Sequence, residues 1–298
     1  MQPKLLITGA TGFVGHNLLK ASKNNWDAWG LACQSAQKHQ YPYLQNVDLC
    51  NYKQIKTYLK NTKPDAIIHL AAHSNPNECQ NNPHTDKLNI YAAADLAGLA
   101  SDTHIPFVFS SSDLIFDGQH APYDETSPYN PLSRYGEQKV IAETKILQRY
   151  DQATICRLPL MFGWAPPQTK CLLRSMANAI KTYQPLKLFV DEVRTPVDAF
   201  DAAQGLLLSI TQPSSIFHLG GKTSLSRFEL GHLLAMQLKI NNPNIITVNQ
   251  DDINMPAPRA KDVSLKSEKA FNIGYSPHSP SDIIKNFINK ENERLNNK

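Results

Sequence analysis

The sequence predicts an α/β protein built on a doubly wound parallel sheet, and three observations support this. Short apolar runs alternate with segments of helical period through the first two-thirds of the 298 residues. These runs are apolar throughout, as in strands covered on both faces. A glycine-rich turn, residues 8–15, follows the first run and opens the first helical segment. Strand–helix alternation of this kind places helices on both faces of one sheet.

The expected elements follow in chain order. The short apolar runs predict strands at residues 4–8, 28–33, 65–72, 106–111 and 153–158. Between them, apolar residues three and four apart predict helices at residues 13–23, 86–102 and 132–149. The alternation of the two periods accounts for most of the first 160 residues.

After Gly163 prolines interrupt this pattern. Ser226 and Glu229 form the spacing of a capping box, so a helix should begin there and run to Leu238. The other elements expected here are a helix at 171–183, a short strand near 188, a strand at 215–220 that returns to the main sheet, and a helix at 281–295. The sequence therefore predicts a second, discontinuous lobe.

Composition excludes several function classes. The net charge of +4 comes without a basic run, which argues against a nucleic-acid partner. No apolar stretch approaches the ~18 residues of a membrane span. Five cysteines without a CxxC pair predict reduced thiols in a cytoplasmic protein. His69, His73, Cys79 and His84 cluster in the sequence but match no zinc spacing, so no metal is expected.

The glycine turn is the first candidate binding site. Gly9 permits the tight turn, Gly12 lets backbone approach a pyrophosphate, and Gly15 allows the helix to pack against the strand. The following helix offers its N–H groups and positive dipole end to a phosphate. This spacing favours a dinucleotide cofactor over a glycine turn without a ligand. The cofactor contacts expected from the turn are Gly9, Thr11, Gly12, Phe13, Val14 and Gly15.

The end of the second strand leaves both NADP and NAD open, with a lean toward NADP. No acidic residue stands there to accept a hydrogen bond from a ribose 2′-hydroxyl. Ser35 and Lys38 could instead reach a 2′-phosphate. Asp48 and Leu49 fall where a third strand would end and could touch the adenine, although a simple loop aspartate explains Asp48 equally well.

Tyr135 and Lys139 are the main catalytic candidates. Four residues apart on a predicted helix, they project from one face, where an ammonium can lower the pKa of a phenol from its usual value near ~10. A phenol tuned in this way can exchange a proton with a carbonyl or hydroxyl group. Ser112, at the carboxyl end of a predicted strand, could donate a hydrogen bond to the same carbonyl. The alternative for each is structural: a serine cap, an interfacial tyrosine and a solvated lysine.

With these motifs the chain resembles the extended short-chain dehydrogenases/reductases, and within them the dTDP-4-dehydrorhamnose reductase-like (RmlD-type) family. The resemblance covers nearly the whole length. It rests on the glycine turn, the Tyr135/Lys139 pair, and the segments at 111–118, 157–163, 191–196, 217–221 and 259–265.

The resemblance implies a Rossmann-type nucleotide-binding domain of residues 1–161 and about 196–221, with a smaller substrate-binding lobe of about 162–195 and 222–298. It implies an NAD(P)H-dependent reductase of a 4-keto sugar nucleotide, a monomer or homodimer. Ser112, Tyr135 and Lys139 would be catalytic. The cofactor would also contact Ala71, Ala72, Asn89 and Leu158, together with Tyr135 and Lys139.

Substrate contacts are expected from His73, Asp113, Arg194 and Arg259. The two arginines could bind a diphosphate or form a salt bridge between the lobes, whereas Arg157 is expected to be structural. Leu114 and Leu160 stand where the reductases usually carry Tyr and Trp, which leaves the sugar open. Leu114 also stands where dehydratases carry a second carboxylate, so dehydration is disfavoured. An epimerase of the same fold and an NADP-binding regulatory subunit, resembling the methionine adenosyltransferase beta subunit, remain as alternatives.

Overall fold

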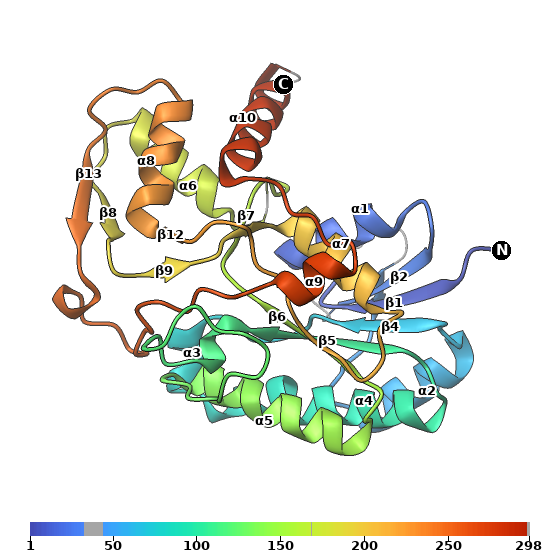
Figure 1. Ribbon diagram of the computed structural model, residues 1–298. Coiled ribbons are helices and arrows are strands. Elements are labelled where there is room, and N and C mark those ends of the chain that lie inside the picture. Colours follow the sequence, from blue (N-terminus) through green and yellow to red (C-terminus); the bar gives the residue numbers. More distant parts are fainter. Residues whose placement is uncertain (33–43, 168, 297–298) are drawn as a thin grey trace.

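A computed structural model describes residues 1–32, 44–167 and 169–296 of the chain. Within this part, a Rossmann-type sheet of seven parallel strands runs in the order β11-β6-β5-β4-β1-β2-β3 (Figure 1). The strands are β1 (Lys4–Thr8), β2 (Asp27–Ala32), β3 (Leu44–Asn46), β4 (Ala66–His69), β5 (Phe107–Ser112), β6 (Thr154–Leu158) and β11 (Ile216–His218). The strands β2 and β3 are added on one side of β1, and the strands from β4 onward are added on its other side. The boundary between β1 and β4 is therefore the topological switch point, where open α/β sheets bind ligands.

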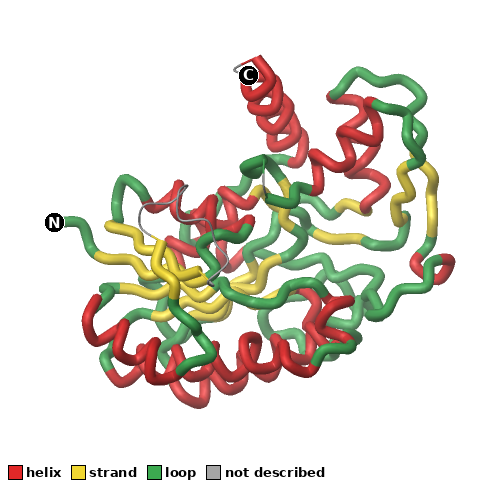
Figure 2. Tube along the Cα trace, turned by 180° about the vertical axis from the view of Figure 1, so that it is seen from behind, coloured by secondary structure: helices red, strands yellow, loops and turns green. Residues whose placement is uncertain are grey.

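Helices cover both faces of this sheet, as the sequence predicted. On one face α1 (Phe13–Ser22) packs against α7 (Ala199–Ser209) over a core that includes Leu5, Ile7 and Ile68. On the other face α2 (Tyr52–Thr62), α4 (Ala93–Asp102) and α5 (Arg134–Arg149) form a row, seen from behind in Figure 2. Alternate strand residues point to opposite faces, so the apolar runs supply both cores.

The structure differs from the predicted elements in one helix that is divided and one helix that was not expected. The single helix predicted for residues 86–102 is a π-helix, Lys87–Ala92, followed by α4. The sequence prediction omitted α2, whose only buried residues are Ile55 and Leu59. Four apart, these two face the sheet, and the rest of the helix is polar, so its apolar pattern was too short to detect. Before the π-helix lie α3 (Pro76–Gln80) and a 3₁₀ turn, Pro83–Thr85.

Helices α6 (Leu172–Lys181), α8 (Arg227–Gln237) and α10 (Pro280–Asn296) gather beyond the carboxyl ends of the strands (Figure 1). Helix α9 (Glu268–Asn272) instead packs on the face of the sheet that carries α1 and α7, where Ala270 joins the same core. Residues Asp113–Ile115 and Gln250–Asp252 form 3₁₀ turns. Three short strand pairs join β7 (Met161–Phe162) with β10 (Val197–Asp198), β9 (Val193–Arg194) with β12 (Leu225–Ser226), and β8 (Leu186–Phe189) with β13 (Ile245–Val248).

Helices α6, α8 and α10 share one apolar core with β8. The predicted capping box is confirmed, because the Ser226 hydroxyl accepts from Glu229 N–H and the Glu229 carboxylate accepts from Ser226 N–H. The strand predicted at 215–220 does return to the sheet, where β11 pairs with β6. The exact lobe boundaries stay a prediction.

A buried ion pair ties the sheet to α5. Arg157 on β6 and Glu143 on α5 are both essentially inaccessible, with 3.0 Å between Arg157 Nη2 and a Glu143 carboxylate oxygen. The hydroxyl of Tyr129 donates to Glu143 at 2.8 Å and accepts from Arg157 at 2.9 Å. The ring of His218 on β11 contacts the same guanidinium. Arg157 is therefore structural, as predicted.

Among the described residues, no helix is long and apolar enough to cross a membrane.

Candidate active site

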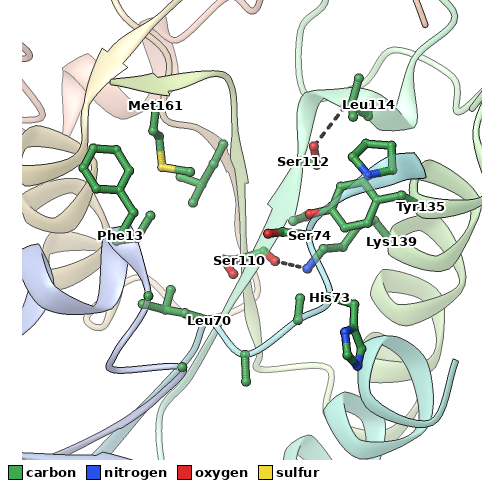
Figure 3. Close-up of a pocket in the computed structure, with 18 of the residues that line it drawn as sticks. Phe13, Leu70, His73, Ser74, Ser110, Ser112, Leu114, Tyr135, Lys139 and Met161 are labelled. Atoms are coloured by element: carbon green, nitrogen blue, oxygen red, sulfur yellow. Dashed lines mark hydrogen bonds between the residues drawn. The ribbon is translucent and has the colours of Figure 1, made fainter. Parts of the chain in front are cut away.

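A cleft of about 1500 Å³ runs along the carboxyl ends of the strands, from the glycine turn to β8 and α8. It brings together residues from distant parts of the chain (Figure 3). Of the predicted cofactor residues, Gly9, Thr11, Gly12, Phe13, Val14, Gly15, Asp48, Leu49, Ala71, Ala72, Tyr135, Lys139 and Leu158 line it. Of the predicted catalytic and substrate residues, Ser112, His73, Asp113, Arg194 and Arg259 also line it.

The glycine turn fits a dinucleotide. Gly9 has a φ of +67°, and a Cβ there would lie 2.8 Å from the backbone nitrogen of Ala71. A Cβ at Gly15 would lie 2.3 Å from the Gly9 carbonyl oxygen. Gly12 caps α1 without a side-chain hydrogen bond to the first N–H groups, which is the arrangement that suits a phosphate at a helix N-terminus.

Thr8, directly before the glycine turn, connects β1 to the end of β4 through hydrogen bonds. Its hydroxyl accepts from the N–H groups of Leu70 and Ala71 at 3.1 and 3.2 Å, so its own proton is directed to Nδ1 of His69 at 2.8 Å. These bonds hold the ends of β1 and β4 together at the switch point. The cofactor-facing backbone therefore rests on a junction in which the Thr8 hydroxyl is fully hydrogen-bonded.

Past β3, Asp48 lies in the cleft wall, and its carboxylate accepts from Cys50 N–H at 2.9 Å. Ser35 and Lys38, the candidates for a 2′-phosphate, lie outside the described residues. The structure therefore leaves the preference between NADP and NAD open.

Ser112 ends β5 and opens a 3₁₀ turn. Its hydroxyl accepts from Leu114 N–H at 3.2 Å and donates to the Asp113 carboxylate at 3.1 Å. The side chain is buried yet lines the cleft. Its position at the carboxyl end of a central strand agrees with the sequence prediction.

Lys139 is held rigidly on α5, which Ser133 caps by accepting from Gly136 N–H at 3.2 Å. The ammonium donates to the Ser110 carbonyl at 2.8 Å (Figure 3). It also lies 4.5 Å from the centre of the Phe109 ring. Burial lowers the pKa of Lys139 to about 8, against the effect of the Glu143 carboxylate. The lysine is thus fixed beside the strand and not solvated.

The pKa predicted for Tyr135 was wrong in direction. Burial raises the pKa of its phenol above the usual value, and the nearby Asp113 carboxylate adds to the shift. The ammonium of Lys139 lies 5.8 Å from the centre of the Tyr135 ring and is bonded to Ser110, so it does not outweigh desolvation. In this structure Tyr135 is a firmly protonated acid.

Asn89 was expected to contact the cofactor, but it does not line the cleft. The side-chain amide of Asn89 lies behind the cleft lining. Its oxygen accepts from His73 N–H at 2.8 Å, and its nitrogen donates to the His73 carbonyl at 3.0 Å and to Gln138 Oε1 at 2.7 Å. Gln138 in turn donates to Thr85 and Asp86, both at 2.7 Å. Asn89 therefore supports the loop after β4 from behind and connects it to α5.

The charged end of the cleft holds two residues that the sequence did not indicate, Glu192 and Arg227. Nε of Arg227 donates to Glu192 at 2.8 Å. Arg194 is bound by three backbone carbonyls, of Val193, Ala260 and Lys261, and lies 3.5 Å from the Asp113 carboxylate. Arg194 thus pairs with Asp113 in the turn after β5, which is the kind of contact expected of a salt bridge between the predicted lobes. No spacing rule connects Glu192 with Arg227, 35 residues away, so only the fold could reveal this pair.

The guanidinium of Arg259 makes fewer hydrogen bonds than that of Arg194. Its Nη2 donates to Asn77 Oδ1 at 2.9 Å, whereas Nη1 is buried and has no hydrogen-bond partner among the described residues. Since Arg259 lines the cleft, this nitrogen can serve an anionic ligand.

The sequence cluster of His69, His73, Cys79 and His84 does not form a metal site in the described part of the chain, where no group of three metal-ligating side chains occurs. His69 is buried and bonded to Thr8, and the thiol of Cys79 donates to the His73 carbonyl at 3.2 Å.

Comparisons with known proteins agree with this geometry. The family model described as the RmlD substrate binding domain matches residues 3–292. The chain belongs to this family. It is 26% identical to methionine adenosyltransferase 2 subunit beta of Danio rerio over 93% of this chain and 86% of that protein. It is 25% identical to a probable low-salt glycan biosynthesis reductase, Agl14, of Haloferax volcanii, over 86% of this chain and 87% of that protein.

Among solved structures, a dTDP-4-dehydrorhamnose reductase of Bacillus anthracis in complex with NADP shares the fold. The TM-score is 0.86 at 20% identity, covering 97% of this chain and all of the other.

Proposed function

We propose that the protein is an NAD(P)H-dependent reductase of a 4-keto sugar nucleotide. One observation carries the proposal: Ser112, Tyr135 and Lys139 line the same cleft as the glycine turn. A carbonyl group between Ser112 and Tyr135 would lie beside the site that suits a dinucleotide. The free thiols of Cys50, Cys79, Cys156 and Cys171 fit a reducing cytoplasm.

When bound, the nicotinamide supplies the hydride. Tyr135 donates its proton to the oxygen of the carbonyl as that oxygen gains charge, and Ser112 donates a hydrogen bond to the same oxygen. The raised pKa of Tyr135 keeps the phenol protonated until that charge develops. The buried ammonium of Lys139 then favours the phenolate that remains.

A nucleotide diphosphate is supported at the charged end of the cleft. The unpartnered Nη1 of Arg259 offers it a donor, and the guanidinium of Arg227 is partly exposed there. Leu114 follows Asp113 at the carbonyl end, so the second carboxylate that water elimination needs is absent from this turn. Reduction is therefore favoured over dehydration.

We favour NADP over NAD as the cofactor, because no acidic residue stands at the end of the second strand to accept from a ribose 2′-hydroxyl. A relative by fold, the Bacillus anthracis reductase, was solved in complex with NADP. Titration of the protein with each cofactor, followed by nicotinamide fluorescence, tests the preference.

The decisive test follows NADPH oxidation with a panel of 4-keto sugar nucleotides. Tyr135→Phe should abolish turnover, by a factor of about 10²–10⁴, while NADPH binding persists. Tyr129→Phe is a matched control, because Tyr129 lies in the structural cluster around Arg157. If Tyr135→Phe kept wild-type activity, Tyr135 would not be the catalytic acid.

A second candidate is a regulatory subunit that binds NADP without turnover. The 26% identity to methionine adenosyltransferase 2 subunit beta, over 93% of this chain, favours it. Size-exclusion chromatography with a methionine adenosyltransferase catalytic subunit distinguishes the two: a stable complex without carbonyl reduction supports the regulatory role. An epimerase of the same fold would convert its substrate without net consumption of cofactor.

A further inference from the structure

Asp113 lies where the catalytic strand meets the arginine cluster. It is 4% exposed, and one carboxylate oxygen accepts from the Ser112 hydroxyl at 3.1 Å. The other oxygen has no hydrogen bond within the described residues, although Nε of Arg194 lies 3.5 Å away. Ser112 has a single proton, and in this structure its hydroxyl donates that proton to Asp113.

We propose that Asp113 is a positioning residue whose charge decides whether Ser112 can donate its proton to the substrate carbonyl. This inference rests on the proposed reductase function. An ionised Asp113 retains the Ser112 proton in a charge-assisted hydrogen bond, which is roughly twice as strong as a neutral one. A protonated Asp113 is a weaker acceptor, so the hydroxyl can turn to the carbonyl oxygen.

The change of acceptor by Ser112 adds no proton to the reduction and removes none from it. Ser112 keeps its proton throughout and only changes acceptor. The hydride still comes from the cofactor, and the proton of the product alcohol still comes from Tyr135.

The surroundings of Asp113 allow both charge states near neutrality. Burial raises its pKa to about 6, against the lowering effects of Arg194, the Ser112 hydrogen bond and Arg227. Glu192 raises the pKa further, and the phenol of Tyr135 faces the same carboxylate. Burial raises the pKa of Tyr135, and the pKa of Lys139 is about 8, so neither of these two catalytic candidates changes its charge near pH 6, where Asp113 does.

The first test is the pH profile of kcat/KM between about pH 5 and 7.5. Wild-type carbonyl reduction should fall as the pH rises past about 6, approaching ten-fold per pH unit. Asp113→Asn should remove this decline while leaving NADPH affinity intact. Asp151→Asn, in the exposed turn after α5, is the control that should keep the decline. A decline that survives in Asp113→Asn would overturn the proposal, because a merely structural role leaves the pH dependence in place.

The second test needs no turnover. Carboxyl ¹³C NMR of the whole protein, with Asp113→Asn used to assign the resonance, follows the titration of Asp113. The Ser112 hydrogen bond lowers this pKa, so Ser112→Ala should raise it. An unchanged Asp113 titration in Ser112→Ala refutes the coupling. If the titration moves but no 4-keto sugar nucleotide is reduced by the wild type, the proposed function fails and the coupling stands.

Discussion

Gly15→Ala probes the glycine turn with one added methyl group. The new Cβ would lie 2.3 Å from the Gly9 carbonyl oxygen and 2.6 and 2.7 Å from Ala10 Cα and the Ala10 carbonyl carbon. All three are backbone atoms, so no side chain can rotate away. The first turn of α1 must move away from Gly9 and Ala10 in the glycine turn, and its N–H groups move with it.

The size of the effect follows from these contacts. Overpacking of this kind costs about 1–3 kcal/mol, and rigid backbone neighbours place Gly15→Ala at the upper end. Gly98→Ala is the matched control, because its Cβ would meet only the flexible Arg149 side chain, at 3.6 Å. In α4 that change should stabilise the protein by about 0.5–1 kcal/mol through helix propensity.

Urea unfolding and a fluorescence titration with NADPH measure the two consequences. We expect Gly15→Ala to lower the free energy of unfolding and to weaken NADPH binding by more than about ten-fold, or ~1.4 kcal/mol. Gly98→Ala should bind NADPH as the wild type does. Wild-type affinity in Gly15→Ala would refute the role given to the turn.

Three further predictions concern charged residues. Arg157→Met leaves Glu143 buried without its partner and should lower the free energy of unfolding in urea by about 3–5 kcal/mol. Arg149→Met, in a half-exposed pair, should lower it by less than about 1 kcal/mol. Equal losses in the two variants would contradict this. Lys139 has a pKa of about 8 when folded and ~10.4 when unfolded, so the folded state releases this proton first. The wild type should therefore gain stability relative to Lys139→Met as the pH rises from about 8 to about 10.4, and a constant difference would show that the ammonium is not desolvated. Arg259→Gln should raise KM for a sugar nucleotide and leave NADPH affinity unchanged, and an unaltered KM would exclude Arg259 from the substrate site.

The parts of the fold that the sequence predicted are those with local causes. The glycine turn, the capping box at Ser226 and the apolar strands each depend on neighbouring residues, and each is present. The helix α2 escaped detection because only Ile55 and Leu59 are buried in it. Its place is set by packing against the sheet and not by a long apolar pattern.

The sequence predicted part of the cleft lining and less of its electrostatics. Ser112, Tyr135 and Lys139, which the sequence grouped together, line one cleft, and their catalytic roles stay a prediction. The raised pKa of Tyr135 arises from burial, which is a property of the folded state that spacing does not contain. For the same reason the orientation of Asn89 and the contact between Glu192 and Arg227 required the tertiary structure.

The proposed reduction transfers a hydride to a keto carbon with net consumption of the cofactor. Incubation with NADPH that carries deuterium at the transferable position, followed by mass spectrometry and NMR of the product sugar nucleotide, follows this transfer. We expect one deuterium at the new carbinol carbon and one oxidised cofactor for each product molecule. A product that is epimerised without deuterium or net cofactor oxidation, or no conversion of any 4-keto sugar nucleotide, would contradict it.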